Sequence, residues 1–565
     1  MSDKILIVGG NAGGAAAAAR LRRLDEKSEI VIFEKGEHVS FASCGLPYYI
    51  GGIIDREELL VQTPESLESR FDIEVRTNIE VVDIYPDKKE IMVEDSKNSR
   101  TYTETYDKLI LSPGAEPVEP PIEGIEETSN VFTLRKIPDA DVLKEKLNSN
   151  RAEKAVVVGA GFIGLEMVEN LKKQGLEVKL VEMMDQVMPP VDYDIAAMVQ
   201  NRLREKGVDL YLNDKVLSVE PNDGSIDVAL DSGKILSTDF VLLSAGVRPN
   251  TTLAEKAGLD LGETGGIKVN EYLETSKSDI YAIGDAIETV DCVTEDSICV
   301  PLAGPASKQA RIVANNIKME DGADKYECSI GTFIVKIFDL TLASTGKNEK
   351  ELEGKGFDYE KTVIFSKSHA EYYPGASPLW LKLIFHPETG KIYGGQMIGE
   401  KGVDKRIDVL ATAIKFGKSV FDLQKLDLAY APPYSLAKDP INMAGFAAGN
   451  MINGLIDTIH WQDIQKLDSE DVAILDVRKG EELKEEGYLE NSIHIPINEL
   501  RDRLNEVPSD KEIICHCKCG LRSYIAGRFL QQKGYEVRNL SGGYGLVKAI
   551  ERDRDARGLE KIWKT

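Results

Sequence analysis

The same succession of a buried strand, a glycine turn, a helix and a second strand that ends in a carboxylate occurs twice in this chain. The second copy is AVVVGAGFIGLEMVENLKKQGLEVKLVE, where Gly159, Gly161 and Gly164 occupy the turn and Glu182 ends the second strand. Such glycines let the chain turn tightly, let a pyrophosphate approach the backbone, and let the helix pack on the strand. This copy therefore predicts a dinucleotide-binding site at the N-terminus of its helix.

The first copy begins near the N-terminus and departs from the pattern at one position. The strand KILIV (4–8) is followed by the turn GGNAGG, a helix, and the strand EIVIFE, which ends at Glu34. Gly9 and Gly14 match the first and third glycines, but Asn11 replaces the middle one. A glycine turn before a helix can be purely structural, so this copy alone is the weaker indication. Together the two copies predict an α/β protein with two Rossmann-like domains.

The carboxylate of the second copy bears on which nucleotide binds. Glu182 is followed by MMDQ rather than by an arginine. A carboxylate at this place favours the free 2′-hydroxyl of NADH over the 2′-phosphate of NADPH. NADH is the expected nucleotide, and the use of NADPH stays open.

The charge of the chain restricts its partners. The 565 residues suffice for three or four domains, and 69 basic against 95 acidic residues give a net charge of −26. Such a field disfavours nucleic acid and anionic membranes, and an anionic ligand needs local basic or backbone-amide sites. Arg20, Arg22 and Arg23 after the first glycine turn, together with Arg70, supply positive charge. The alternative is that they are solvated helix residues.

The seven cysteines and the N-terminus indicate a compartment. MSDKILIVGG enters an apolar strand without a basic region and a long apolar core, so we expect no signal peptide and a cytoplasmic location. No apolar run is long enough to span a membrane. In a reducing compartment all seven cysteines should be free thiols, and we expect Cys292, Cys299 and Cys328 to be packing or surface residues.

Two cysteines stand in segments typical of reactive thiols. Cys44 lies in SFASCGLPYYIGG, shortly after the first glycine turn. An isolated cysteine is often a small buried hydrophobe, but that interpretation fits poorly in a turn of this composition. Cys517 lies in EIICHCKCGLRS, where a strand, a loop containing Gly520 and a helix start surround it with backbone amides. Such amides lower the pKa of a thiol and hold an anionic sulfur, and Arg522 closes the loop.

A metal site in the same segment is the alternative. Cys515 and Cys517 alternate on a strand, and His516 and Cys519 are adjacent. The spacing lacks the usual Cys-x-x-Cys knuckle, and no second ligand pair follows. We therefore predict no metal.

Two regions of the chain resemble known families. The two glycine turns, the strands 106–117 and 240–250, and Gly284-Asp285 occur in the order typical of the two-dinucleotide-fold flavoprotein disulfide reductases. Residues 1–447 are most similar to the single-cysteine branch of CoA-disulfide reductases, NADH oxidases and NADH peroxidases. Residues 457–550, with LDVR, the Cys517 loop and SGGY, resemble a single-domain rhodanese.

These resemblances imply a domain organisation. They imply an FAD-binding domain (1–113 and 247–325), an NAD(P)H-binding domain (114–246), an α+β dimerisation domain (326–447), a linker (448–456) and an α/β rhodanese domain (457–565). They imply that FAD contacts Gly9, Asn11, Gly14, Glu34, Lys35, Asp285 and Pro301. They imply that the nicotinamide nucleotide contacts Gly159, Gly161, Gly164, Glu182 and Gly246.

The resemblance also implies the catalytic chemistry. Reductases with an internal cysteine pair show a Cys-x4-Cys spacing, but Tyr49 stands at the second position, so the substrate supplies the other sulfur. NADH peroxidases carry a histidine where this chain has Ala12, which disfavours peroxide reduction. Two tyrosines of the partner subunit should approach Cys44. Tyr372 and Tyr430 are the expected pair, with Tyr373 and Tyr434 as an alternative register and His369 as a less favoured proton donor.

The predicted substrate carrier is coenzyme A. The expected CoA contacts are Arg20, Arg23, Ser40, Ser43, Arg70 and Lys438. We predict a homodimer that reduces CoA persulfide or polysulfide, and CoA disulfide, through Cys44, while Cys517 supplies sulfane sulfur as a persulfide. Cys519 either attacks that persulfide or is merely tolerated. The rival functions are an NADH oxidase or peroxidase with a Cys44 sulfenic acid, and a redox sensor of sulfane sulfur.

Overall fold

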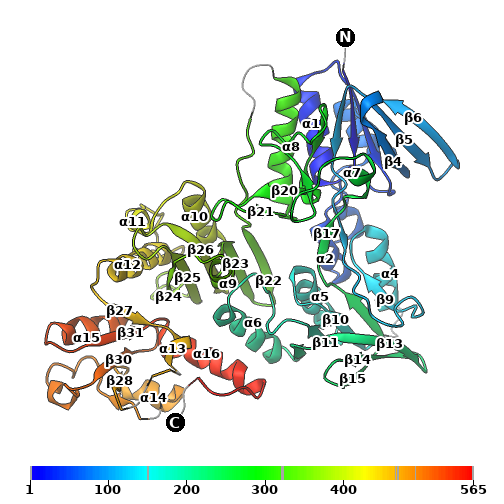
Figure 1. Ribbon diagram of the computed structural model, residues 1–565. Coiled ribbons are helices and arrows are strands. Elements are labelled where there is room, and N and C mark those ends of the chain that lie inside the picture. Colours follow the sequence, from blue (N-terminus) through cyan, green and yellow to red (C-terminus); the bar gives the residue numbers. More distant parts are fainter. Residues whose placement is uncertain are drawn as a thin grey trace. The chain divides into compact units, whose positions relative to one another are not determined.

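The computed structural model describes residues 3–148, 152–319, 324–464, 466–467, 470–489 and 491–562. The chain divides into two compact units, one of Met1–Met183 with Tyr211–Gly331 and one of Met184–Leu210 with Thr332–Thr565. Figure 1 labels the helices and strands of both units. Among the described residues, no helix has the length and apolar character needed to cross a bilayer.

The first unit contains the sheet of the first glycine turn. Its strand order is β19-β7-β1-β2-β3, and all its pairs are parallel. The strands span Lys4–Val8 (β1), Glu29–Glu34 (β2), Glu74–Thr77 (β3), Lys108–Leu111 (β7) and Ile280–Ala282 (β19). Helix α1 (Ala12–Leu24) connects β1 to β2 and lies beside α8 (Ala303–Lys318). Ile5, Leu6 and Ile7 are fully buried, as expected for a parallel strand covered on both faces.

The second glycine turn belongs to an equivalent sheet in the same unit. Strands β11, β10, β16 and β9 lie in that order and pair in parallel. They span Glu177–Glu182, Lys154–Val158, Phe240–Leu243 and Val131–Thr133, and α5 (Phe162–Lys173) connects β10 to β11. Each parallel sheet is also accompanied by a three-stranded antiparallel sheet. These strands are β4 (Ile79–Tyr85), β5 (Glu90–Asp95), β6 (Arg100–Thr105), β13 (Val216–Asn222), β14 (Ser225–Leu230) and β15 (Ile235–Thr238).

The second unit contains two further sheets. An antiparallel sheet has the order β22-β23-β26-β25-β24, and a parallel sheet has the order β27-β31-β30-β28-β29. The antiparallel strands span Phe333–Ile337 (β22), Leu340–Gly346 (β23), Glu360–Lys367 (β24), Pro378–Phe385 (β25) and Ile392–Gly399 (β26). The parallel strands span Asp457–Ile459 (β27), Val472–Asp476 (β28), Ile493–His494 (β29), Glu512–His516 (β30) and Val537–Leu540 (β31). The two sheets match the α+β and α/β parts that the sequence predicts.

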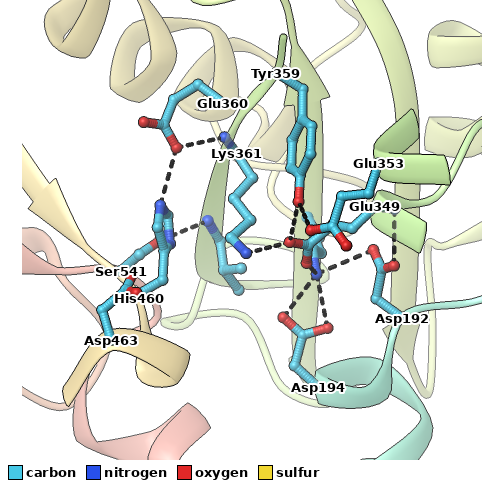
Figure 2. A network of polar contacts seen from close by, with 12 residues as sticks. Asp192, Asp194, Glu349, Glu353, Tyr359, Glu360, Lys361, His460, Asp463 and Ser541 are labelled. Carbon is cyan, nitrogen blue, oxygen red and sulfur yellow. Dashed lines mark hydrogen bonds and ion pairs between the residues drawn. The ribbon is translucent and has the colours of Figure 1, made fainter. Parts of the chain in front are cut away.

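A buried lysine joins three elements of this unit. Lys382 on β25 is fully buried, and its ammonium contacts Asp194 at 2.9 Å, Asp192 at 3.0 Å, and Glu349. Asp192 and Asp194 begin α6 (Tyr193–Glu205), and Glu349 begins α9 (Glu349–Gly354). Figure 2 shows the three carboxylates converging, with Lys361 of β24 also paired to Glu349. The ammonium takes the place that a cation would need among these carboxylates.

The carboxylates of this network respond differently to burial. Burial raises the pKa of Asp192 to about 6, because it outweighs the attraction of Lys382. Burial also opposes ionisation of Glu349, but Lys382 and Lys361 outweigh it and hold the pKa of Glu349 at about 2. Ionisation of Asp192 therefore costs stability.

The parallel sheet of the second unit packs on α6 and on the antiparallel sheet. Side chains of α6, β24 and β25 share one hydrophobic core with α16 (Gly543–Ala556) and strands β27, β30 and β31. At its edge the Tyr193 hydroxyl donates to Asp553 at 2.7 Å, and the Val363 N–H donates to the Ser541 hydroxyl at 2.9 Å. His460 pairs with Glu360 at 2.9 Å (Figure 2). Helix α12 (Pro440–Ile452) precedes β27 along the chain. The exact domain boundaries given above remain predictions.

One prediction about the cysteines is wrong. Cys292 and Cys328 form a disulfide, with Cα atoms 5.0 Å apart, and are not free thiols. The cause is tertiary: Asp291 and Ser329 form a β-bridge, and the Cys292 N–H donates to the Ser329 carbonyl at 2.9 Å. Cys299 is free and contacts the Thr264 hydroxyl at 3.0 Å. The spacing of the cysteines contained no sign of this bridge.

The disulfide predicts a thiol count. Unfolded protein that has never met a reductant should react with a thiol reagent at the five free cysteines, and at all seven after reduction. Cys328→Ser should lower the free energy of unfolding of the first unit by about 3–4 kcal/mol, because the loop that it closes is long. Cys299→Ser is the matched control and should leave that stability nearly unchanged. Seven reactive thiols before reduction would contradict the bridge.

The Lys382 network predicts a pH dependence. The pKa of Asp192 is raised by folding, so this group stabilises the fold at low pH and costs stability as the pH rises from about 4 to about 6. Asp192→Asn should remove that cost. The free energy of unfolding of this variant minus that of wild type should therefore increase by about 2–3 kcal/mol as the pH rises from about 4 to about 6.

The chain offers a selective probe for this measurement. All three tryptophans lie in Thr332–Thr565, so tryptophan fluorescence during denaturation follows the second unit. Asp185→Asn, at an exposed position, is the control and should follow wild type at every pH. A difference between Asp192→Asn and wild type that does not change with pH would refute the assignment.

Candidate functional site

The first glycine turn has the geometry of an anion-binding loop. Gly9 has φ +92°, and a Cβ there would lie 2.1 Å from the Ser112 carbonyl oxygen. A Cβ on Gly14 would lie 1.9 Å from the Gly9 oxygen, so glycine is required at both positions. Glu34 accepts a hydrogen bond from the Gly10 N–H at 3.0 Å. The N-terminus of α1 and the Glu34 carboxylate therefore border the same turn, as expected for a dinucleotide.

The second glycine turn repeats this geometry. Gly159 has φ +100°, and a Cβ on Gly164 would lie 2.0 Å from the Gly159 oxygen. Glu182 accepts from the Ala160 N–H at 2.7 Å, the counterpart of the Glu34 contact. A Cβ on Gly161 or Gly246 would meet no atom within 4 Å. The open space over Gly161 fits the close approach of a pyrophosphate, so the residues present suit a dinucleotide.

Among the other residues expected near FAD, Asp285 lies beside a partner that the sequence did not suggest. Asp285 is in the short helix Gly284–Ala286, and Arg135 donates to its carboxylate at 3.2 Å. Lys35 and Pro301 are exposed, and the Asn11 side chain does not cap α1. Arg135 lies 150 residues before Asp285, so no local pattern could have indicated the pair.

The Cys44 thiol is exposed in a helical turn tied to the first glycine turn. Cys44 lies in Ser43–Gly45, directly before α2 (Leu46–Ile50). The Ser40 N–H donates to the Gly10 carbonyl at 2.9 Å, which fixes this segment against the nucleotide-binding turn. Ser40 has φ +48°, so the chain turns sharply shortly before Cys44. The thiol is thus free to react and stands near the first nucleotide site.

The tyrosines after Cys44 connect it to the second nucleotide helix. The Tyr48 hydroxyl donates to Glu166 of α5 at 3.1 Å, and burial raises the pKa of Glu166. Tyr49, which stands where a second cysteine would be, donates to Asp141 at 2.9 Å. Tyr49 therefore has a structural role, and no second thiol is available to Cys44 within this segment.

A cluster of arginines lies beside the first nucleotide-binding helix. Burial and the charges of Arg311 and Arg23 lower the pKa of Arg20. Helix α1, which carries Arg20 and Arg23, packs against α8, which carries Arg311. Arg311 is exposed on α8, and the sequence did not suggest it because α8 meets α1 only through the fold. Arg22 is instead buried and donates to four backbone carbonyls, so its role is structural. Arg70 is exposed at the end of α3 (Pro64–Phe71).

In the second unit, the two predicted catalytic tyrosines form an exposed pair. The hydroxyls of Tyr372 and Tyr430 are 3.0 Å apart, and the side chains are 77% and 47% exposed. Tyr373 and Tyr434 are also exposed nearby, since the Ala370 N–H donates to the Ser435 carbonyl at 3.0 Å. Exposed aromatic groups in this number indicate a surface that meets a ligand or a partner.

A buried arginine holds both tyrosine loops. Arg406 donates to the Ser368 carbonyl at 3.0 Å, to the Ser435 hydroxyl at 3.1 Å, and to Asp439. His369 is buried, and its Nδ1 lies 3.1 Å from the Ala370 carbonyl, which agrees with a structural role. Lys438 is exposed on the second loop.

The Cys517 loop lies between β30 and α15 (Leu521–Gln531). Cys517 is fully buried, and its sulfur accepts from the Gly520 N–H at 3.1 Å and from the Ser523 hydroxyl at 3.5 Å. Gly520 has φ +94°, which turns the chain into the helix. A hydrogen bond from the Cys519 thiol, aided by those from Ser523, holds the pKa of Cys517 well below its usual value despite burial.

The charged residues around this loop are paired. Arg522 donates to both oxygens of Glu482, and this pairing raises the pKa of the guanidinium. Cys515 belongs to the core under the loop, and burial raises its pKa. His516 is fully buried and stacks on Tyr544. Among the described residues, these cysteines and His516 do not gather their ligand atoms around one point.

Three segments of the chain match known protein families. Residues 3–309 match the family described as pyridine nucleotide-disulphide oxidoreductase, residues 332–439 its dimerisation domain, and residues 463–549 a rhodanese-like domain. A coenzyme A disulfide reductase of Staphylococcus aureus is 38% identical over 446 residues, which cover 79% of this chain and 99% of that protein.

Two solved structures extend the likeness over the whole chain. The structure of reduced Bacillus anthracis CoADR-RHD is 50% identical, with a TM-score of 0.95, and covers 98% of this chain and 99% of that one. An NAD-dependent persulfide reductase from A. fulgidus is 40% identical, with a TM-score of 0.90, and covers 96% of this chain and 99% of that one. The fold and the fusion of the rhodanese-like domain are thus shared.

The open space at Gly161 predicts a separation of binding from folding. Gly161→Ala should leave thermal stability unchanged, because the added Cβ meets nothing, but should raise the KM for NADH by about 10- to 100-fold. Gly164→Ala is the contrasting variant and should destabilise the protein, because its Cβ would overlap the Gly159 oxygen. An unchanged KM in Gly161→Ala would show that no pyrophosphate approaches this turn.

Proposed function

Because this chain belongs to the pyridine nucleotide-disulphide oxidoreductase family, we propose that it reduces CoA persulfide and CoA disulfide through Cys44 at the expense of NADH. The single observation that carries this proposal is the exposed Cys44 thiol, tied to the first glycine turn and followed by a tyrosine at position 49. The substrate then supplies the second sulfur of the reactive disulfide, which a second cysteine supplies in reductases with an internal cysteine pair. Sulfide and free CoA are the products from the persulfide.

Family membership implies FAD and a pyridine nucleotide. FAD, when bound, supplies two electrons that originate from the nicotinamide. The first glycine turn, Glu34, Lys35, Asp285 and Pro301 would hold it, and the second turn with Glu182 and Gly246 would hold the nucleotide. The Glu182 carboxylate favours NADH, since it would repel a 2′-phosphate.

The residues around Cys44 bind and orient the substrate. The Arg20, Arg23 and Arg311 cluster attracts the phosphates of CoA in a chain that is otherwise strongly negative. Ser40, Ser43, Arg70 and Lys438 are the further proposed CoA contacts. The Cys44 thiolate attacks the sulfur–sulfur bond of the substrate, and either sulfur can receive the attack.

The chain acts as a homodimer in this proposal. Its dimerisation domain presents the exposed Tyr372 and Tyr430 pair, and we assign these hydroxyls to the active site around Cys44 in the other subunit. Two hydroxyls at hydrogen-bond distance can hold a proton for the departing thiolate or sulfide. The cytoplasm is the proposed location.

The rhodanese-like domain supplies the sulfane sulfur. Cys517 receives it from a donor as a persulfide, and the Gly520 N–H and the Ser523 hydroxyl stabilise the anionic sulfur. Arg522, held by Glu482, adds positive charge at the rim of the loop. CoA then accepts the sulfur and presents it to Cys44.

One observation favours a second candidate. An exposed thiol with no cysteine partner can be oxidised to a sulfenic acid, as an NADH oxidase or peroxidase requires. Ala12 in the first turn offers no side chain for proton transfer to peroxide, which makes this candidate the weaker one.

One set of assays separates these functions. NADH consumption is followed with CoA persulfide, CoA disulfide, hydrogen peroxide or oxygen as the sole acceptor. The two CoA substrates should support rapid turnover, and Cys44→Ser should lower kcat with both by about 10³-fold or more, because the nucleophile is lost. Cys517→Ser should lose sulfur transfer from thiosulfate, which Cys44→Ser should keep. Rapid turnover with peroxide alone would overturn the proposal.

A further inference from the structure

The Cys517 loop contains a second thiol placed against the first. Cys519 follows Cys517 after one residue, and the N–H of the next residue, Gly520, lies 3.1 Å from the Cys517 sulfur, so the loop that contains Cys519 folds back over that sulfur. The lowered pKa of Cys517, of which Cys519 is the main cause, agrees with this arrangement. Cys517 is fully buried, whereas Cys519 is half-buried and so lies on the solvent side of the pair. A sulfur atom added to Cys517 is therefore held next to the Cys519 thiol.

The loop is fixed in this conformation by contacts with α16. The Tyr544 N–H donates to the Cys517 carbonyl at 2.8 Å, and the Gly545 N–H donates to the Lys518 carbonyl at 2.9 Å. A Cβ on Gly543 would lie 2.9 Å from the Cys519 nitrogen, so glycine is required for this approach. The contacts with α16 thus fix the backbone that carries Cys517 and Cys519.

We propose that Cys519 is a resolving thiol, which attacks the Cys517 persulfide, releases sulfide and leaves a Cys517–Cys519 disulfide. This inference rests on the part of the proposed function in which Cys517 carries sulfane sulfur, and it adds a second route for that sulfur, which leaves as sulfide instead of passing to CoA. The Cys519 proton passes to the outer sulfur of the persulfide, and the Cys519 sulfur then bonds to Cys517 Sγ. The bond between Cys517 Sγ and the outer sulfur breaks, and HS⁻ leaves with the electron pair. The sulfane sulfur is reduced, and the two cysteines are oxidised.

Two CoA thiols return the loop to its reduced form. The first forms a mixed disulfide with one cysteine, and the second displaces that cysteine and forms CoA disulfide. The small ring closed by a Cys-x-Cys disulfide is strained, and strained disulfides are readily reduced by thiols. CoA disulfide is the substrate that the Cys44 site reduces with NADH in the proposed function. The rhodanese-like domain thereby generates the substrate of the reductase.

The ionisation of the pair agrees with this sequence of events. The hydrogen bond to Cys517 raises the pKa of Cys519, so Cys519 holds its proton until a sulfur atom arrives on Cys517. Cys515 precedes Cys517 by the same interval but points into the core, where burial raises its pKa. Cys515 is therefore the matched control for Cys519.

The test is a single turnover in full-length Cys44→Ser protein with thiosulfate and without thiol or NADH. This protein should release one sulfite and one sulfide per chain, and its mass should fall by two hydrogen atoms, with the bridge mapped to Cys517 and Cys519. Adding Cys519→Ser should still give sulfite and a chain heavier by one sulfur atom, but sulfide should fall below about a tenth of the unaltered amount. Adding Cys515→Ala should leave the sulfide yield intact. CoA added to the oxidised protein should yield one CoA disulfide per chain.

The outcomes separate this inference from the proposed function. If both proteins release sulfite and the chain with Cys519 also keeps a stable persulfide without releasing sulfide, the resolving role is refuted and the carrier role of Cys517 stands. If neither protein releases sulfite or gains sulfur, the carrier role fails, and the inference fails with it. Equal sulfide release with and without Cys519 also refutes the resolving role.

Discussion

Positive potential from the backbone is the constraint on which this protein depends. A chain with a net charge of −26 repels phosphates, thiolates and persulfides, yet each predicted site has to hold such an anion. The same structural feature binds the anion in all three predicted sites: a parallel strand ends, a glycine with positive φ turns the chain, and a helix begins. Gly9, Gly159 and Gly520 perform this turn for the two nucleotides and for the Cys517 sulfur. Side chains add positive charge at Arg20, Arg23 and Arg311, beside the first turn.

The second unit relies on a different interaction. A buried ammonium at Lys382 gathers the first residues of α6 and α9 onto the antiparallel sheet, and the ring of carboxylates leaves its positive charge fully compensated. Buried charges of this kind specify an arrangement more than they stabilise it. The tyrosine loops depend similarly on Arg406, which is buried and bonded to both of them. The exposed hydroxyls are thus supported by rigid polar groups beneath them.

Local sterics made much of the fold predictable. Gly9, Gly14, Gly159 and Gly164 each leave no room for a Cβ, so the turns, their helices and the terminal carboxylates could be identified from the sequence. The Cys517 loop could be identified for the same reason, and Tyr49 showed that Cys44 lacks an internal partner. The antiparallel sheet and the Tyr372 and Tyr430 pair were predicted from resemblance and not from pattern.

The features that the sequence could not predict are contacts between elements that are far apart in the chain. Arg311 joins the arginine cluster because α8 lies beside α1, and Asp285 pairs with Arg135 across 150 residues. The Cys292–Cys328 bridge depends on two extended segments becoming neighbours, and an argument from the redox state of a compartment gave the wrong answer for it. The sequence around Asp192, Asp194 and Glu349 shows no sign of a shared role. The three carboxylates are related only through their ion pairs with Lys382, which lies on another element.

The hydrophobic core shared by α6, β24, β25 and the rhodanese-like sheet also determines what loss of that domain would do. Ala197, Val363 and Trp380 pack in this core, so a chain without the domain would expose an apolar surface. Solubility is therefore a reason to keep the domain even where sulfur transfer is not needed. Substitution of Cys517 is expected to be tolerated more readily than loss of the fold around it.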